Sequence, residues 1–246
     1  MSLAVLKSRA LVGLQAPEVC VEVHLANGLP AFTLVGLPDV EVREARDRVR
    51  AALQTGQFEF PQRRITVNLA PADLPKEGGC FDLPIALGIL AASGQIPGDK
   101  LGAFEFAGEL SLTGELRPVR GALALARQAA NSGRTLILPA VNAAEAALVK
   151  GVTILPAASL LAVVAHLCGH TLIAPYAGEA LFHAPAYPDL ADVKGQVQAR
   201  RTLEVAASGQ HSLLFYGPPG TGKSMLAQRL PGLLPPMDDD EALESA

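Results

Sequence analysis

Residues 213–224 read LLFYGPPGTGKS. An apolar run of strand character precedes a glycine-rich turn that fits the pattern GxxxxGK[ST], and Met225, Leu226 and Leu230 behind it recur at helical spacing. A strand, this turn and a helix in that order are typical of a phosphate-binding loop in an α/β domain. The candidate binding residues are Gly217, Pro218, Pro219, Gly220, Thr221, Gly222, Lys223 and Ser224.

The residue types of this loop explain the chemistry expected of it. Glycines let backbone N–H groups converge on phosphates, and the helix that follows adds the positive end of its dipole. Lys223 would reach the β- and γ-phosphates as a cation, and Ser224 would supply a hydroxyl to Mg²⁺. We therefore expect ATP with Mg²⁺ as the cofactor. The alternative is an ordinary glycine-rich turn with an incidental lysine.

Composition indicates a folded protein. The 246 residues are 50% hydrophobic and 18% charged, which excludes a disordered chain. A formal net charge of -4 does not fit a protein that binds nucleic acid by bulk charge, although a local basic patch remains open.

The cysteines and the hydropathy pattern indicate the cellular compartment of the protein. The three cysteines, Cys20, Cys80 and Cys168, are too far apart for a CxxC zinc or redox pair, and their odd number fits poorly with a disulfide framework. The N-terminus lacks an export signal, and the longest apolar stretch, residues 155–168, is shorter than the roughly 20 residues that cross a bilayer. We expect a cytoplasmic protein with no membrane partner.

Upstream of the loop, strands and helices are predicted to alternate. Apolar positions alternate over residues 19–25 and again at 32–34 around Asn27-Gly28, which predicts a β-hairpin. Helical spacing after Asp39 predicts a helix with Asp39 as N-cap and Gly56 as its stop. Further strands are expected at 64–69, 103–110, 135–138 and 152–155, and helices at 81–92, 121–131, 141–149 and 157–167. This order predicts an α/β fold.

Proline and glycine interrupt the pattern between residues 169 and 188, where we place a linker. We thus expect a first domain at 1–168 and a second at 189–246, with a helix at 195–207 and a strand at 212–215.

The second stretch is too short for a complete nucleotide-binding domain. It offers no acidic strand end, water-orienting residue or arginine finger, so we expect no catalytic residue in this chain. The acidic run at 238–241 follows no strand and reads as a solvated loop.

Two stretches of the first domain are too particular for packing alone: PADLPKEGGCFDLP at 71–84 and GELSLTGELRPVRG at 108–121. They resemble the proteolytic domain of Lon-type ATP-dependent proteases, in which a PKxGxS loop carries a serine nucleophile and the second motif leads to a lysine. Cys80 stands at the serine position and Leu123 at the lysine position. Because leucine cannot take the proton, proteolysis is not expected.

No motif ties a base to Cys80, so we interpret it as a small, partly buried residue at a loop–helix junction rather than a nucleophile. Asp82 is expected to cap the helix that follows.

Five segments precede the phosphate loop in a particular order: VGLPD at 35–39, NLAPAD at 68–73, KEG at 76–78, FDLPIA at 81–86 and GEL at 108–110. With these segments in this order, the chain resembles the YifB/ComM family of magnesium-chelatase-like AAA+ proteins. The resemblance covers essentially the whole chain. It implies a non-proteolytic, Lon-protease-like α/β domain of ribosomal-protein-like βα fold, followed by the start of a P-loop AAA+ domain whose remainder the chain lacks. It further implies a hexameric ring of identical subunits that acts on DNA as an ATP-dependent helicase in branch migration.

Other interpretations stay open. Arginines crowd residues 43–50 and 63–64, but Glu41, Glu44 and Asp47 interleave with them, which favours an ion-paired solvent face over a phosphate-binding patch. Arg200 and Arg201 could face nucleotide or a neighbouring subunit. A metal-chelatase motor, a protein-remodelling ATPase, and a first domain that serves chiefly for oligomerisation or partner binding are the alternatives.

Overall fold

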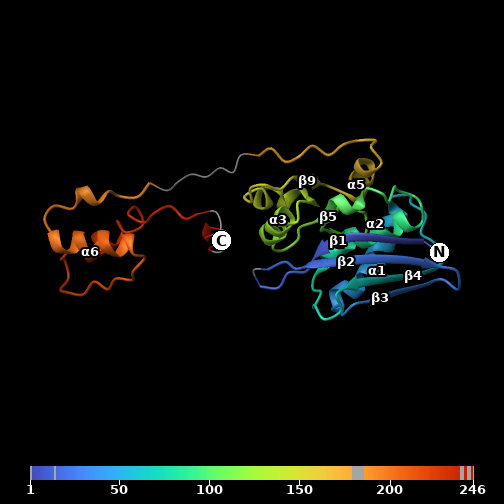
Figure 1. Cartoon of the computed structure of the whole chain (residues 1–246), viewed down its shortest axis with the longest axis horizontal. Helices are drawn as coiled ribbons and strands as arrows, with labels where there is room; N and C mark the ends of the chain where they lie inside the picture. Colours follow the sequence, from blue (N-terminus) through green and yellow to red (C-terminus); the bar gives the residue numbers. More distant parts are fainter. Residues whose placement is uncertain (1, 14, 179–185, 239–240, 243–244, 246) are drawn as a thin grey trace. The chain divides into compact units, whose positions relative to one another are not determined.

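The fold is known from a computed structural model (Figure 1), which describes residues 2–13, 15–178, 186–238, 241–242 and 245. The chain divides into two compact units, residues 1–180 and 181–246. This division falls inside the stretch expected to be a linker, of which residues 179–185 lie outside the described part. Each unit is considered by itself below.

Unit 1 is built on a seven-stranded sheet with the strand order β3-β4-β2-β1-β5-β8-β9. Strand β2 runs antiparallel to β1 and β4, whereas the other neighbouring pairs are parallel. The expected mixed α/β class is thereby confirmed. The strands are β1 Ser2–Arg9, β2 Glu18–Ala26, β3 Ala31–Val35, β4 Arg64–Ala70, β5 Phe104–Phe106, β8 Thr135–Pro139 and β9 Ile154–Ala157.

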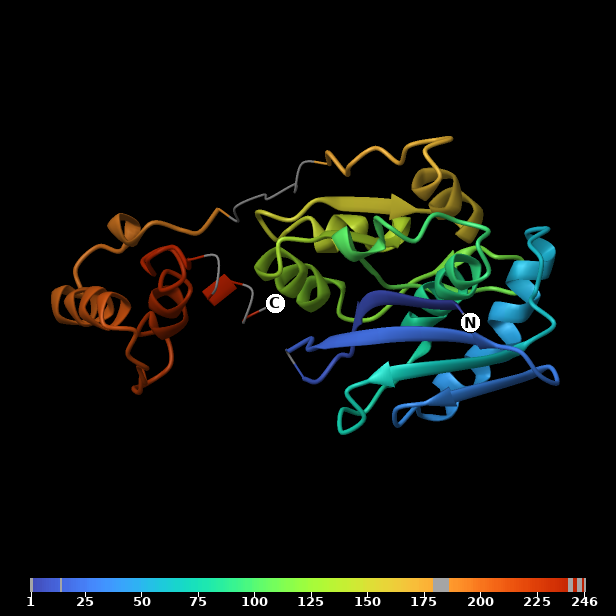
Figure 2. The same cartoon turned by 45° about the vertical axis from the view of Figure 1, so that its right-hand side comes forward.

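Helices cover one face of the β3-β4-β2-β1 half of the sheet (Figures 1 and 2). Helix α2, Asp82–Ala92, packs on β1 and β2 and against α1, Val40–Thr55. Nearly every residue of α2 is buried because the helix lies between the sheet and α1. The opposite face of these four strands carries no helix within the described residues, and Leu3 and Val5 are exposed there. The remaining helices are α3 Ala122–Asn131, α4 Ala143–Ala146 and α5 Leu160–Leu167.

Helix α1 confirms the sequence prediction at both ends. The Asp39 side chain accepts a hydrogen bond from the backbone N–H of Val42 at 2.7 Å, as an N-cap does, and Gly56 closes the helix. Its buried positions recur three or four residues apart, and the face between them is solvated. They are Val42, Ala45, Val49, Ala52 and Leu53.

The predicted hairpin at residues 18–35 is wrong. Both strands exist, but β4 lies between them, antiparallel to β2 and parallel to β3. The turn at Asn27-Gly28 reverses the chain without pairing the strands, because α1 acts as the crossover that returns β4 alongside β3. A local turn signal does not specify the pairing partner of the strand that follows it.

Three further elements differ from expectation. The strand predicted at 103–110 ends at Phe106, and Glu109–Leu110 (β6) pairs instead with Leu116–Arg117 (β7) in a separate two-stranded sheet. The helix predicted at 141–149 is a 3₁₀ turn followed by the single turn of α4. Strand β1 was not predicted at all, although its buried positions Ala4, Leu6 and Ser8 alternate. The other predicted elements of unit 1 are present, with ends that agree with the prediction or differ from it by up to three residues.

Unit 2 is small. Helix α6, Val197–Ser208, and the five-residue α7, Lys223–Ala227, confirm the two predicted helices. The strand predicted at 212–215 is not formed, since within the described residues of this unit no other strand offers it a hydrogen-bonding partner. The side chains that form its core are Leu190, Val193, Leu203 and Leu226.

Candidate functional site

The glycine-rich loop at residues 217–224 has three glycines in backbone conformations with positive φ. Gly217, Gly220 and Gly222 have φ angles of 148°, 81° and 82°. Side-chain-bearing residues rarely adopt these angles, so glycine is required at all three positions. Gly222 is also the N-cap of α7, which begins with Lys223.

The Lys223 ammonium group folds back over this loop. Its Nζ donates to the carbonyl oxygens of Gly217 at 2.9 Å and Pro218 at 2.7 Å, and it lies 3.5 Å from Oγ1 of Thr221. None of these partners is a carboxylate. The charge of Lys223 is therefore held in the loop by neutral acceptors, which leaves it available to an anion.

A residue that the sequence analysis missed also contacts the loop. The side-chain Nε2 of Gln196 donates to the carbonyl oxygen of Thr221 at 3.2 Å, and Gln196 has a φ angle of 52°. Gln196 precedes α6 and is remote from the loop in sequence, and no local pattern indicated this contact. It ties the start of α6 to the loop.

The two arginines of α6 differ in their surroundings. Arg201 forms an exposed ion pair with Glu204 at 3.1 Å. Nε of Arg200 is buried and has no hydrogen-bond partner within the described residues. Neither arginine contacts residues 217–224 through a hydrogen bond or ion pair that the structure describes.

Ser224 is exposed on α7. Of the acidic run, Asp238 and Glu241 accept hydrogen bonds from each other's backbone N–H groups, and residues 239–240 lie outside the described part. Among the described residues no group of three or more His, Cys, Asp or Glu side chains could hold a metal ion. Any Mg²⁺ here would depend on Ser224 and on the phosphates of a nucleotide.

In unit 1 the two unusual stretches, 71–84 and 108–121, come together around a cavity of about 640 Å³. The 3₁₀ turn Gly79–Phe81, the start of α1, β6 and the segment that leads into α3 border it. Its lining residues are Arg9, Leu11, Asp39, Glu41, Glu44, Arg48, Glu77, Gly78, Gly79, Cys80, Glu109, Pro118, Val119, Arg120 and Leu125.

Cys80 lines this cavity, and within the described part of the chain no basic side chain bonds to its thiol. Its Sγ is 3.9 Å from the carbonyl oxygens of Arg9 and Glu77, and burial raises the pKa of the thiol to about 12. The thiol is therefore protonated at neutral pH and a poor nucleophile. Lys76 is buried and donates instead to the carbonyl oxygen of Pro71, while the Leu123 amide bonds to Glu145.

Asp82 is not the helix cap that the sequence predicted. Its carboxylate makes no capping bond to α2; it accepts from Arg48 of α1 and from the backbone N–H of Leu110. Burial raises its pKa to about 6 in spite of these bonds. The tertiary partner Arg48 lies 34 residues away in sequence, so local capping rules do not reveal it.

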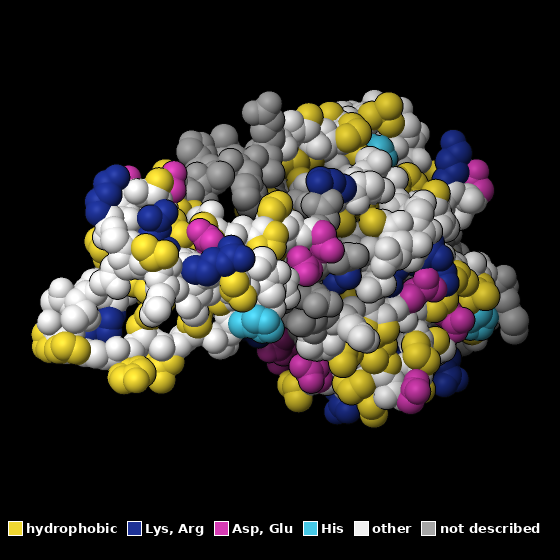
Figure 3. Space-filling model, turned by 60° about the vertical axis from the view of Figure 1, so that its left-hand side comes forward, with side chains coloured by type: hydrophobic (Ala, Val, Ile, Leu, Met, Phe, Trp, Pro, Cys, Tyr) yellow, Lys and Arg dark blue, Asp and Glu magenta, His cyan; other side chains and the backbone are white. Residues whose placement is uncertain are grey.

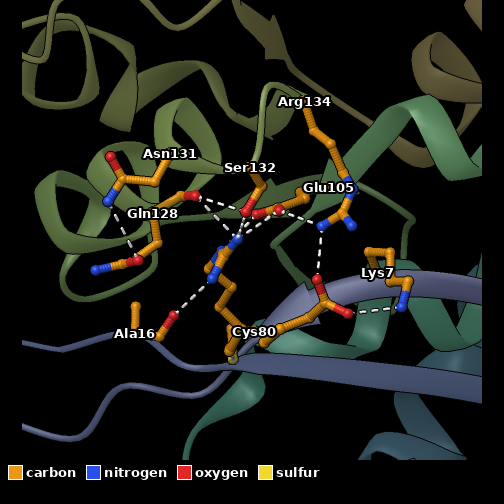
Figure 4. Close-up of polar contacts among 10 residues, drawn as sticks. Lys7, Ala16, Cys80, Glu105, Gln128, Asn131, Ser132 and Arg134 are labelled. Carbon is orange, nitrogen blue, oxygen red and sulfur yellow. Dashed lines mark hydrogen bonds and ion pairs between the residues drawn. The ribbon is translucent and has the colours of Figure 1, made fainter.

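Arg9, which lines the cavity, belongs to an ion-pair network (Figure 4). Arg9 of β1 binds both carboxylate oxygens of Glu105 at 2.6 Å, and Arg134 adds a bond to the same carboxylate at 2.9 Å. Arg134 and Lys7 each form an ion pair with the carboxylate of Glu18. The network joins β1, β2, β5 and the segment between α3 and β8.

Two of the four arginines in residues 43–50 form ion pairs, so the expected ion-paired solvent face is present only in part. Arg46 pairs with Asp47 at 3.0 Å, and Arg48 approaches Glu44 at 3.7 Å. In the view of Figure 3, basic and acidic side chains lie near one another on the surface of each unit. This mixture gives the DNA hypothesis no support of its own.

Both units of the chain are similar to known proteins. Residues 21–142 match the family model described as subunit ChlI of Mg-chelatase, and residues 189–246 match the model described as magnesium chelatase, subunit ChlI. The chain is 56% identical over 252 residues to competence protein ComM of Haemophilus influenzae, an alignment that covers 100% of this chain and 49% of that protein. It is 52% identical over 247 residues to YifB of Escherichia coli, again covering 100% and 49%.

The chain belongs to the ComM/YifB family. It is thus a magnesium-chelatase-like member of the AAA+ proteins. It spans about half the length of the ComM and YifB proteins that it matches. No helix among the described residues is long and apolar enough to span a membrane.

Proposed function

We propose that the complete protein is an ATP-driven AAA+ motor of the ComM type. The observation that carries this proposal is the loop at 217–224, where the motif, the glycine backbone angles and the position of Lys223 agree. Family membership favours the same function. ATP and Mg²⁺ are the cofactors that such a loop would hold.

The residues present fit this cofactor. Among the described residues, the ammonium group of Lys223 is bound to neutral oxygens alone, so it could turn from the carbonyls of Gly217 and Pro218 to phosphate oxygens. The glycines leave the backbone N–H groups of the loop accessible to an anion. Ser224 would ligate Mg²⁺, which neutralises phosphate charge when bound. Gln196 would hold the loop through Thr221.

Unit 1 acts in this proposal as a Lon-like, non-proteolytic domain. A cysteine whose thiol stays protonated stands where a protease needs an activated nucleophile, and the lysine position holds Leu123. We further propose that the complete protein assembles as a ring in which unit 1 packs as a collar and supplies no chemistry of its own. Its output would be branch migration of DNA by a hexameric helicase.

A second candidate is a protein-remodelling or metal-chelatase motor, which the match to magnesium-chelatase subunit ChlI favours. The two candidate functions can be distinguished by measuring ATP hydrolysis, with and without DNA, by a polypeptide of the full length of the relatives. We expect forked DNA to stimulate hydrolysis and junctions to migrate, with both effects lost in Lys223→Ala. A rate of ATP hydrolysis that does not change when DNA is added would contradict the helicase proposal and would be consistent with the remodelling or chelatase motor.

A further inference from the structure

Residues 189–196, here called the lead-in segment, connect the stretch predicted as a linker to α6. At the end of this segment, Nε2 of Gln196 donates to the carbonyl oxygen of Thr221 in the glycine-rich loop at 3.2 Å. At its start, the carbonyl oxygen of Asp189 accepts from Nε of Arg229 at 3.0 Å. The lead-in segment is therefore bonded to the chain both before and after α7.

Arg229 also bonds to α7 itself. Its Nη1 donates to the carbonyl oxygen of Met225 at 2.7 Å, and its Nη2 lies 3.9 Å from Oδ2 of Asp192. The guanidinium group can reach these acceptors together because its donors point outward in one rigid plane. Only 11% of the side chain is exposed. One side chain thus holds α7 and the start of the lead-in segment together.

Apolar packing adds to these bonds. The core of unit 2 contains two buried side chains of the lead-in segment, one of α6 and one of α7: Leu190, Val193, Leu203 and Leu226. Helix α7 has five residues, far fewer than the roughly 12–15 at which an isolated helix becomes marginally stable in water. Tertiary contacts therefore set the position of α7 and of the glycine-rich loop that leads into it.

The backbone at the end of the lead-in segment has an unfavourable conformation. Gly195 and Gln196 have φ angles of 69° and 52°, both in the left-handed region. Glycine adopts such angles readily, whereas a residue with a β-carbon rarely does. Strained residues persist where the surrounding structure holds them, and they cluster at functional sites. In this conformation the Gln196 side chain reaches the glycine-rich loop.

We propose that the lead-in segment controls the affinity of the glycine-rich loop for nucleotide, with Gln196 and Arg229 as the positioning residues through which it acts. Both act on the phosphates only by holding the loop and α7 in place. The inference rests on the proposed function, because it concerns the same nucleotide site. By thermodynamic linkage, nucleotide binding and the ordering of the lead-in segment favour each other by the same factor.

Titration of the 246-residue chain with ATP and Mg²⁺, and separately with inorganic tripolyphosphate and Mg²⁺, tests this role. Gln196→Glu keeps the size of the side chain but removes the donor to Thr221, so we expect both ligands to bind about threefold to tenfold more weakly. Arg229→Met should weaken both ligands as well. Weaker binding of ATP with unchanged binding of tripolyphosphate would overturn the proposal, since Gln196 would then act on the base.

Hydrogen exchange gives a readout that a merely structural role would not move. In the wild type, ATP and Mg²⁺ should slow the exchange of the backbone amides of residues 189–196. In Gln196→Glu at saturating ATP we expect this slowing to be lost. Equal protection of the segment by ATP in both proteins would show that Gln196 does not couple it to the nucleotide.

Matched controls separate this coupling from general effects of charge. Gln198→Glu makes the same change of charge at an exposed position on α6, and Lys194→Ala removes an exposed cation from the lead-in segment; both should bind like the wild type. Thermal unfolding shows whether each variant folds. If the folded wild type binds neither ligand, the proposed function fails and this inference with it. If the wild type binds both and Gln196→Glu binds them as tightly, only this inference fails.

Discussion

The guanidinium of Arg48 on α1 binds the carboxylate of Asp82 at the start of α2 through two hydrogen bonds, Nε to Oδ2 at 2.6 Å and Nη2 to Oδ1 at 3.0 Å. Asp82 is fully buried and also accepts from the backbone N–H of Leu110 at 3.1 Å. One carboxylate therefore connects α1, α2 and β6. Of these elements, α1 and β6 border the cavity of unit 1.

Arg48→Ala should destabilise unit 1 strongly. It removes the cation from a buried carboxylate, a loss that typically costs about 3–5 kcal/mol. Chemical denaturation measures the change. Arg46→Ala is the control on the same helix, because Arg46 pairs with Asp47 in solvent, and we expect no measurable loss there. Equal effects of the two substitutions would contradict the role of the Arg48–Asp82 pair.

Asp82 should make stability depend on pH. Burial raises its pKa to about 6, above the roughly 3.9 of an unfolded aspartate, so its contribution is fully present below pH 4 and is lost as pH rises through 6. The stability of wild type relative to Asp82→Asn should thus fall by roughly 2 kcal/mol between pH 4 and 7, at about 1.4 kcal/mol per pKa unit. Denaturant unfolding of both proteins across this pH range measures the difference in their free energies of unfolding. A stability of wild type relative to Asp82→Asn that rises with pH would contradict the prediction.

Gly36→Ala should disrupt the edge of the sheet. Gly36 follows β3 with a φ angle of 100°, and a Cβ there would overlap the carbonyl oxygen of Leu69 in β4. Gly98→Ala is the matched control, since a Cβ at Gly98 meets no atom within 4 Å. We expect the melting temperature to fall by several degrees for Gly36→Ala alone. Similar melting of both variants would show that the close approach is absent.

The sequence predicts local features of this fold well. The cap at Asp39, the stop at Gly56 and the burial of α1 follow from rules that act within a few residues. The glycine positions of the 217–224 loop are likewise set by backbone angles that the motif itself requires.

Features that depend on distant partners could not be predicted in this way. The neighbour of β2 is β4, which arrives only after α1, and the partner of Asp82 is an arginine on another helix. Gln196 reaches the loop at Thr221 from the start of a separate helix. Single-sequence periodicity reports which face of an element is buried and not what covers it.

Cys80 should resist alkylation. With a thiol pKa of about 12, roughly three units above an ordinary cysteine, its thiolate fraction is about a thousandfold smaller at neutral pH. Mass spectrometry of iodoacetamide-treated protein should find Cys80 labelled far more slowly in the folded than in the urea-unfolded chain. Equally fast labelling in both states would show that the fold does not suppress the thiolate, which would contradict the interpretation of Cys80 as an unreactive, buried thiol.

The central claim is that residues 217–224 hold the triphosphate of ATP. Equilibrium titration of the 246-residue chain with ATP and Mg²⁺ tests it most directly, with Lys223→Ala and, as a control in the same unit, the exposed Lys194→Ala. We predict that wild type and Lys194→Ala bind alike and that Lys223→Ala binds at least about tenfold more weakly. Binding that is unchanged in Lys223→Ala, or no binding by the folded wild type, would contradict the claim.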